Sequence, residues 1–373
     1  MVNPSVAHAP NDLREILARF SLPGSLLYAE RFGSGHINDT YVASYDQAGT
    51  RGRYILQRVN HEVFKNVPEL MENISRVTAH IESKIPANEI RRVPSLHLTV
   101  DGLPFHQTPQ GDFWRVYRYV EGARTYDAVE DPRQAYEAAR MFGQFQQLLA
   151  DLPGGRLHET IPHFHDTPRR LQDLRRAAEE DVAGRRQEVM AELDFAFMRE
   201  GEVSRLLDLV AQGEIPERVT HNDTKLSNVM LDEQTREGVC VIDLDTVMPG
   251  LSLYDFGDLV RFAANTAAED ETDLAKIDVS LTIFEAIVQG YVAGAGNILT
   301  DAEWDHLVFA AKLMTYEVGI RFLTDYLEGD MYFKTQRPRH NLERARNQLR
   351  LVDRIEAADG PLQAIVRRCR AAR

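Results

Sequence analysis

The feature that most constrains this chain is the stretch His221–Asn228 (HNDTKLSN), which is followed by a predicted hairpin and by Asp243 at the end of an apolar strand. Phosphoryl transfer from ATP needs one carboxylate to orient the acceptor hydroxyl, and an amide and a second carboxylate to hold Mg²⁺ against the phosphates. Asp223, Asn228 and Asp243 supply these groups in that order. The pattern predicts a site that uses ATP and Mg²⁺, with Asp223 as the base and Asn228 and Asp243 on the metal. Lys225, on the same tight loop, is predicted to neutralise charge on the transferred group.

The same residues allow a structural alternative, in which an exposed turn leads into a hairpin and Asp243 caps a strand end. The apolar strand before Asp243 and the strand-rich region upstream favour the catalytic interpretation. Asp245 projects to the same side as Asp243 if the strand continues, so it is predicted to reach the metal or the substrate, with a solvated loop acid as the alternative. The letters DFG begin at Asp255, but Asp243 already occupies the metal position. We interpret Asp255 and Asp258 as buried or capping carboxylates that support the catalytic loop.

The composition is that of an ordinary globular protein, with 43% apolar and 27% charged residues among 373. The formal net charge of −14 argues against non-specific binding to nucleic acid or to an anionic membrane, because both require basic surface. No apolar run approaches the ~20 residues of a membrane span, and the first residues lack the pattern of a secretory signal. The two cysteines, Cys240 and Cys369, have no metal-binding spacing. We therefore expect a cytoplasmic protein without nucleic-acid, membrane or obligate protein partners.

The order of hydrophobic patterns predicts a sheet-rich first third and a helical remainder. Strand patterns cover residues 26–31, 39–45, 53–59, 95–100 and 112–120, and an amphipathic helix covers 68–84. Helical patterns then cover residues 131–152, 166–184, 188–212, 274–294, 301–327 and 340–371. This order predicts an α+β, bilobal, protein-kinase-like fold. We expect a nucleotide-binding lobe over 1–118, a hinge over 119–124 and a catalytic and substrate-binding lobe over 125–373.

The predicted nucleotide-binding lobe contains a weaker sequence indication of phosphate binding. Gly33 and Gly35 lie between two predicted strands and are predicted to present backbone N–H groups to phosphates, with an ordinary hairpin turn as the alternative. The predicted strand over 53–59 carries Gln57 where kinases carry a phosphate-binding lysine, and Arg58 lies beside it on the opposite face. A neutral amide cannot supply the usual charge. The nucleotide site must therefore differ from the general kinase pattern at Gln57, with Arg58 or the metal as the substitute.

These motifs, taken together, resemble the aminoglycoside-phosphotransferase and choline-kinase superfamily. Within it the chain closely resembles bacterial N-acetylhexosamine 1-kinases, which also carry glutamine at the position of Gln57. The stretches that carry the likeness run over most of the chain and are 35–38, 54–57, 114–117, 163–168, 221–228, 242–246, 254–258 and 321–330.

The resemblance implies ATP-dependent phosphorylation of the anomeric hydroxyl of N-acetylglucosamine or N-acetylgalactosamine. By this likeness the adenine contacts Tyr119, Val120 and Glu121. The predicted substrate-binding residues are His36, Asp223, Asp245, Thr246, Arg321 and Tyr332. Asp245 is included because it lies beside the metal position, and the other five are implied by the likeness. Two other hypotheses stay open: the same mechanism on another small alcohol, sugar or aminoglycoside, and a nucleotide-binding pseudokinase. The expected partners are ATP and a neutral amino sugar.

Overall fold

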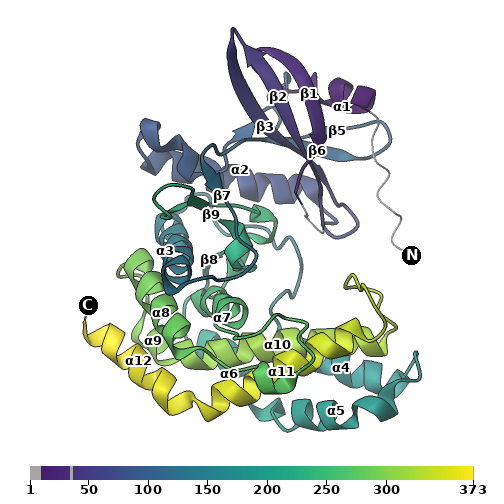
Figure 1. Cartoon of the computed structure of the whole chain (residues 1–373), viewed down its shortest axis with the longest axis vertical. Coiled ribbons are helices and arrows are strands. Elements are labelled where there is room, and N and C mark those ends of the chain that lie inside the picture. Colours follow the sequence, from purple (N-terminus) through teal and green to yellow (C-terminus); the bar gives the residue numbers. More distant parts are fainter. Residues whose placement is uncertain (1–9, 34–36, 373) are drawn as a thin grey trace.

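The computed structural model describes residues 10–33 and 37–372, in which a sheet-rich N-terminal part stands above a mainly helical C-terminal part (Figure 1). The upper sheet is antiparallel, with strand order β1-β2-β3-β6-β4 and with β5 also pairing with β6. Its strands are β1 (Ser25–Arg31), β2 (Asp39–Gln47), β3 (Thr50–Val59), β4 (Leu96–His97), β5 (His106–Gln107) and β6 (Phe113–Arg118).

The two faces of this sheet have different roles, because successive side chains of a strand point to opposite sides. The outer face is apolar: Leu56 and Trp114 are buried there in one cluster with Leu17 of α1 (Pro10–Leu17). The inner face carries a polar row instead, since register pairs Thr40 of β2 with Gln57 of β3, and Gln57 with Arg115 of β6. The residue that replaces the expected lysine therefore faces the same way as a buried arginine.

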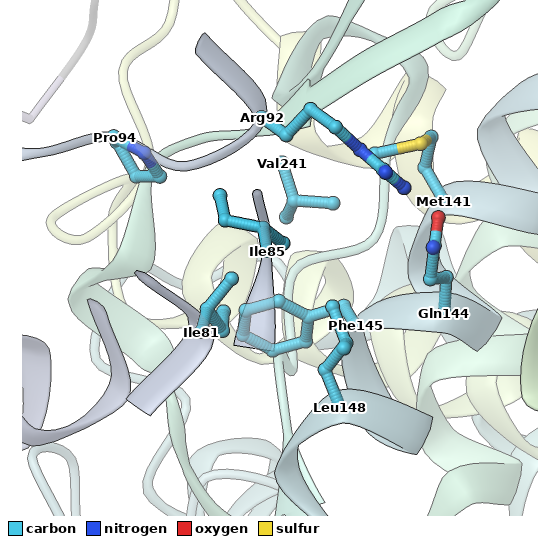
Figure 2. A pocket seen from close by; sticks show the side chains of 9 residues that line it. All are labelled: Ile81, Ile85, Arg92, Pro94, Met141, Gln144, Phe145, Leu148 and Val241. Carbon is cyan, nitrogen blue, oxygen red and sulfur yellow. The ribbon is translucent and has the colours of Figure 1, made fainter. Parts of the chain in front are cut away.

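Helix α2 (Val67–Lys84) connects the two parts of the molecule. Asn66 caps its first turn, and its apolar residues at spacings of three and four are fully buried. They pack toward α3 (Pro132–Leu149) and leave a cavity of only about 20 Å³, room for about one water molecule (Figure 2). The residues that line it are Ile81, Ile85, Arg92, Pro94, Met141, Gln144, Phe145, Leu148 and Val241. One continuous apolar core thus crosses between the sheet-rich and the helical parts.

The helical part is built around two long packed pairs, α3 with α8 and α10 with α11. Its helices are α4 (Thr167–Glu180), α5 (Met190–Phe197), α6 (Arg205–Ala211), α7 (Ser252–Ala263), α8 (Leu281–Ala295), α9 (Asp301–Asp305), α10 (Leu307–Leu327), α11 (His340–Ala357) and α12 (Asp359–Ala371). Short strands cross the region between the two parts: β7 (Ala123–Arg124), β8 (Arg218–Thr220), β9 (Val229–Asp232), β10 (Gly238–Val241) and β11 (Met248–Gly250). No helix within the described ranges is long and apolar enough to cross a membrane.

The predicted fold class is confirmed, with differences in detail. The predicted helix over 188–212 is broken into α5 and α6 around Gly201, and the strand expected over 95–100 is reduced to Leu96–His97. Helix α7 was not predicted, because its polar residues interrupt the hydrophobic pattern although they are buried. The lobe boundaries at 118 and 124 stay a prediction.

Candidate active site

The loop after β8 gathers three of the predicted catalytic residues. Asn228 ends a short 3₁₀ turn, η4 (Leu226–Asn228), and its Nδ2 donates to the backbone oxygen of Asp223 at 2.9 Å and to Oδ2 of Asp223 at 3.1 Å. The Lys225 ammonium donates to the same Oδ2 at 2.9 Å. Among the described residues, none donates to Oδ1 of Asp223, and about a third of this side chain (32%) is exposed. Oδ1 therefore remains available to accept a hydrogen bond from a ligand.

The charge of Asp223 follows from these neighbours. Burial alone would raise its pKa, but the Lys225 ammonium and the amide of Asn228 favour the ionised form, and the pKa lies below its ordinary value. Asp223 is consequently an ionised acceptor at neutral pH. Burial alone would lower the pKa of Lys225, but attraction to Asp223 and Asp243 raises it, so Lys225 keeps its charge.

Two buried carboxylates of α7 support this loop, as we interpreted from the sequence. Asp255 accepts the backbone N–H groups of His221 at 2.9 Å and of Asn222 at 2.7 Å, and it has no exposed surface. Asp258 accepts the N–H of Thr224 at 3.0 Å. Asn222 adopts a left-handed backbone (φ 65°), a conformation that costs energy outside glycine and concentrates at functional sites. Helix α7 therefore holds the loop in an unusual shape.

The catalytic loop is also tied to the segment after β10, where the predicted metal residue lies. The His221 imidazole pairs with the carbonyl of Ile242 at 2.9 Å. The Thr246 hydroxyl donates to the carbonyl of His221 at 2.7 Å, and Asn222 Nδ2 donates to the carbonyl of Thr246 at 3.0 Å. These hydrogen bonds hold the segment of Asp223 against the segment of Asp243, although the two residues are twenty positions apart in the sequence.

Asp243 and Asn228 have the free oxygens that a magnesium site requires. The Asp243 carboxylate is exposed toward solvent and receives no hydrogen bond or ion pair from the described residues, while Asn228 uses only its amide nitrogen. Loss of hydration beside the surrounding protein, and then repulsion from Asp245, raise the pKa of Asp243 to about 6. The described residues contain no cluster of three His, Cys, Asp or Glu ligands. Mg²⁺ here would complete its coordination with water and phosphate oxygens, its usual habit.

Asp245, which was predicted to reach the substrate, has both carboxylate oxygens engaged inside the protein. Oδ1 is paired with Arg115, and Oδ2 accepts from Asn38 Nδ2 at 2.7 Å. Arg115 donates in turn to Oε1 of Gln57 from Nε at 3.0 Å and from Nη2 at 2.9 Å. Arg58 lies on the other face of β3 and is paired with Asp39 there. Gln57, and not Arg58, therefore faces the same side of the sheet as Arg115 and Asp245.

The predicted adenine-contacting residues lie at the junction of the two parts. The Arg53 guanidinium covers the Tyr119 ring at 3.9 Å and is paired with Glu121. Val120 is buried in a small apolar cluster that also contains the half-buried Met230 and Ile242. Neither Met230 nor Ile242 was among the predicted nucleotide-binding residues, although Ile242 directly precedes Asp243 and Met230 follows Asn228 by two positions.

The glycine-rich connection between β1 and β2 is only partly described. Gly33 has φ 74° and no atom within 4 Å of where a Cβ would lie, so this turn needs glycine for its backbone and not for close packing. Gly35 and His36 lie outside the described residues.

The remaining predicted substrate residues lie on and after α10. The Arg321 guanidinium lies close to two aromatic rings, 5.3 Å from the centre of the Phe164 ring and 5.7 Å from that of Phe333. Tyr332 packs against Phe333 at 4.8 Å and is 60% exposed. One turn before Arg321, Glu317 is fully buried and binds His165 at 2.8 Å. His165 reaches the carbonyl of Asn222 at 3.1 Å, which joins this aromatic cluster to the catalytic loop.

An ionised carboxylate beside a lysine, followed by an asparagine and a second aspartate, is the set of groups that phosphoryl transfer in a kinase-like fold requires. The comparison with known families agrees: residues 29–288 match the model of the phosphotransferase enzyme family. The chain belongs to this family.

Solved structures show the same fold at low sequence identity. An aminopropanol kinase associated with a microcompartment has a TM-score of 0.62 at 16% identity, over 95% of this chain and 98% of that chain. An aminoglycoside phosphotransferase from Alicyclobacillus acidocaldarius has a TM-score of 0.61 at 14% identity, over 99% and 97%. A choline kinase from Cryptosporidium parvum has a TM-score of 0.56 at 13% identity, over 95% and 97%. These similarities confirm the predicted kinase-like fold and leave the acceptor open.

Proposed function

We propose that this protein transfers the γ-phosphoryl group of Mg²⁺-bound ATP to the anomeric hydroxyl of an N-acetylhexosamine, giving the sugar 1-phosphate and ADP. The observation that carries the proposal is the grouping of Asp223, Asn228 and Asp243, in which Asp223 is ionised and its Oδ1 accepts no hydrogen bond from the described residues. A protein that only bound nucleotide would need no such acceptor-facing base.

In the proposed mechanism, Oδ1 of Asp223 accepts the hydrogen bond of the acceptor hydroxyl and aligns its oxygen with the γ-phosphorus. The new P–O bond forms as the bond to the leaving ADP breaks, and the hydroxyl proton passes to Asp223. Lys225 keeps its charge beside this centre and stabilises the transferred group. Asn228 and Asp243 would hold Mg²⁺, which neutralises phosphate charge when bound.

The nucleotide half of the site follows from the apolar cluster at the junction. Val120, Met230 and Ile242 offer apolar surface to a purine ring, and the backbone over Tyr119–Glu121 offers hydrogen-bonding groups at its edge. Gly33 and Gly35 would present backbone N–H groups to the phosphates. The two cysteines are free, which suits the reducing cytoplasm that we propose as the location.

The acceptor assignment rests on the resemblance in sequence and on the chemistry of the pocket. A neutral polyhydroxy sugar needs directed hydrogen bonds, which His36, Thr246, Arg321 and Tyr332 would supply together with Asp223. The low pKa of Asp223 makes it a weak base. An anomeric hydroxyl is more acidic than an ordinary alcohol, so a weak base is sufficient for it.

The test is ADP release with Mg²⁺ and ATP on a panel of N-acetylglucosamine, N-acetylgalactosamine, glucose, galactose, glucosamine, choline and kanamycin, with ³¹P NMR of any product. A sugar 1-phosphate from an N-acetylated sugar supports the proposal. Turnover only on another acceptor would discard the substrate and keep the reaction class. In Asp223→Asn we expect kcat to fall by ~10²–10⁴-fold, the scale for loss of a positioned base. Near wild-type turnover of that variant would refute the assigned base.

A further inference from the structure

The inner face of the upper sheet contains a cation that is almost completely removed from water. Arg115 of β6 is 1% exposed, and a buried charge of this kind is stable only when it is paired and hydrogen-bonded. Its guanidinium has two polar partners among the described residues, the carboxylate of Asp245 and Oε1 of Gln57. Each partner is itself held by a further hydrogen bond. Gln57 donates from Nε2 to Thr40 Oγ1 at 3.1 Å, and Asp245 accepts from Asn38 Nδ2 at 2.7 Å.

Asp245 belongs to the segment that carries the proposed metal ligand. It lies in the 3₁₀ turn η5 (Leu244–Thr246), which begins directly after Asp243. Asp243 has a left-handed backbone (φ 62°), so its carboxylate direction depends on what holds the residues that follow. Asp245 is held by Arg115 and Asn38 through its carboxylate and by Thr160 Oγ1, which donates to its backbone oxygen at 2.9 Å.

This arrangement differs from the lysine-to-helix ion pair of protein kinases. Helix α2 meets the arginine through Met71, whose sulfur is 3.9 Å from Arg115 Nη1 and which carries no charge. The ion pair of this chain runs from the sheet to the metal segment instead of from the sheet to a helix. This pairing explains why a neutral residue stands at position 57, because the side-chain carbonyl oxygen of Gln57 accepts two N–H groups of Arg115.

We infer that Arg115 is a positioning residue, which acts through Asp245 to hold Asp243 in its metal-binding orientation, and that Gln57 is required at its position to accept the guanidinium. A lysine at position 57 would set an ammonium against that guanidinium. The inference rests on the proposed function, since it takes Asp243 as a metal ligand. It makes an unexpected prediction: restoring the kinase-like lysine should impair the site.

The experiment measures metal affinity without turnover. Binding of Mn²⁺ in the presence of a non-hydrolysable ATP analogue is followed by the loss of the free Mn²⁺ signal in electron paramagnetic resonance. Alongside it, kcat and the Mg²⁺ concentration for half-maximal rate are measured on the full chain. The variants are Arg115→Met, Arg115→Lys and Gln57→Lys. Arg58→Met is the matched control, because Arg58 is the neighbouring half-buried arginine on the opposite face of the sheet.

We expect Arg115→Met and Gln57→Lys to weaken Mn²⁺ binding at least tenfold and to raise the Mg²⁺ requirement by a similar factor. Arg115→Lys should recover part of the affinity, and Arg58→Met should match wild type. If Arg115→Met does not fold, Gln57→Lys decides, because it keeps the arginine. Wild-type Mn²⁺ affinity in Gln57→Lys, or equal behaviour of Arg115→Met and Arg58→Met, would overturn the inference.

The two proposals fail in different ways. Normal Mn²⁺ binding by the wild type, without turnover of any sugar, would reject the N-acetylhexosamine assignment and leave the role of Arg115 intact. Unchanged Mn²⁺ affinity in Asp243→Ala would remove the metal ligand on which the inference is built, and would overturn the inference as well.

Discussion

Asp255 shows at the scale of one residue how structural and chemical roles can be separated. Its carboxylate is fully buried and accepts N–H groups from His221, Asn222 and the Gln146 side chain. Asp255→Asn replaces one acceptor oxygen by a donor, so one buried N–H loses its partner, at a cost of ~1–3 kcal/mol. We expect the free energy of unfolding in urea to fall by that amount, with a parallel loss of kcat. A large loss of kcat at unchanged stability would instead give Asp255 a direct part in the chemistry.

Asp232 provides a prediction about pH. Hydrogen bonds from the backbone of Thr235, from Arg91 and from the backbone of Gln234 lower its pKa to about 2, against about 3.9 in an unfolded chain. A carboxyl group with a depressed folded pKa contributes its full stability above the unfolded pKa, and the contribution disappears as the pH falls toward the folded pKa. Asp232→Asn should therefore lower the urea midpoint equally at about pH 7 and pH 5, and by less at about pH 3. A difference that stays constant down to pH 3 would contradict the shift.

Sequence spacing was sufficient to predict contacts between site residues that lie close together along the chain. Asp223, Lys225 and Asn228 share one loop, so their spacing alone predicted that they meet. The pairing of Asp245 with Arg115 joins residues 130 positions apart and depends on how the sheet sits over the loop. No pattern along the chain carries that information, so the sequence predicted contact of Asp245 with the metal or the substrate without indicating its pairing with Arg115; the contact with a ligand stays a prediction.

At the scale of elements, the packing of α3 on α8 depends on glycine. A Cβ on Gly294 would lie 2.0 Å from the backbone oxygen of Arg140, and one on Gly290 would lie 2.1 Å from that of Tyr136. Alanine usually stabilises a helix by ~1 kcal/mol relative to glycine. For Gly294→Ala we expect the opposite, a loss at or above the upper end of the ~1–3 kcal/mol typical of overpacking, because backbone atoms cannot move aside cheaply.

The matched control is Gly360→Ala in α12, where a new Cβ would meet nothing within 4 Å. This variant should be as stable as wild type or slightly more stable in urea unfolding. Equal effects of Gly360→Ala and Gly294→Ala would show that the two helices separate easily, against the close approach seen here.

Helices could be predicted from the sequence where one face is buried and the opposite face is exposed to solvent. Helix α2 shows the expected spacing because one face meets the core and the other faces solvent. Helix α7 is buried on nearly all sides from Ser252 to Arg261, and its acidic residues bind the catalytic loop. The acidic residues of α7 stand where a solvent-facing side would be expected, so the pattern along the chain does not reveal that this side is also buried.

At the scale of the whole molecule, the question is whether the sheet-rich and helical parts unfold together. The apolar core continues from α2 into α3 and onward to α8. Polar bonds cross the same boundary: Asn73 of α2 is fully buried, and its Nδ2 donates to the carbonyls of Val247 at 3.1 Å and of His158 at 2.8 Å. Separating the two parts would therefore expose apolar surface and leave buried polar groups unpaired, so we expect a single cooperative transition although the chain is long.

The chain's two tryptophans allow a direct test, because Trp114 is buried in the upper sheet and Trp304 is buried in α9. Trp304→Phe leaves a reporter only in the sheet, and Trp114→Phe leaves one only among the helices. Fluorescence and far-ultraviolet circular dichroism are followed for each variant during urea unfolding. Within each variant the two signals should give the same midpoint and slope, because the reporter's part unfolds with the rest. A Trp114 signal that changes before the helical signal would mean that the sheet unfolds alone. The buried contacts of Asn73 and Arg115 would then be too weak to hold the metal segment in place without a ligand, and the positioning role of Arg115 would apply only to the bound state.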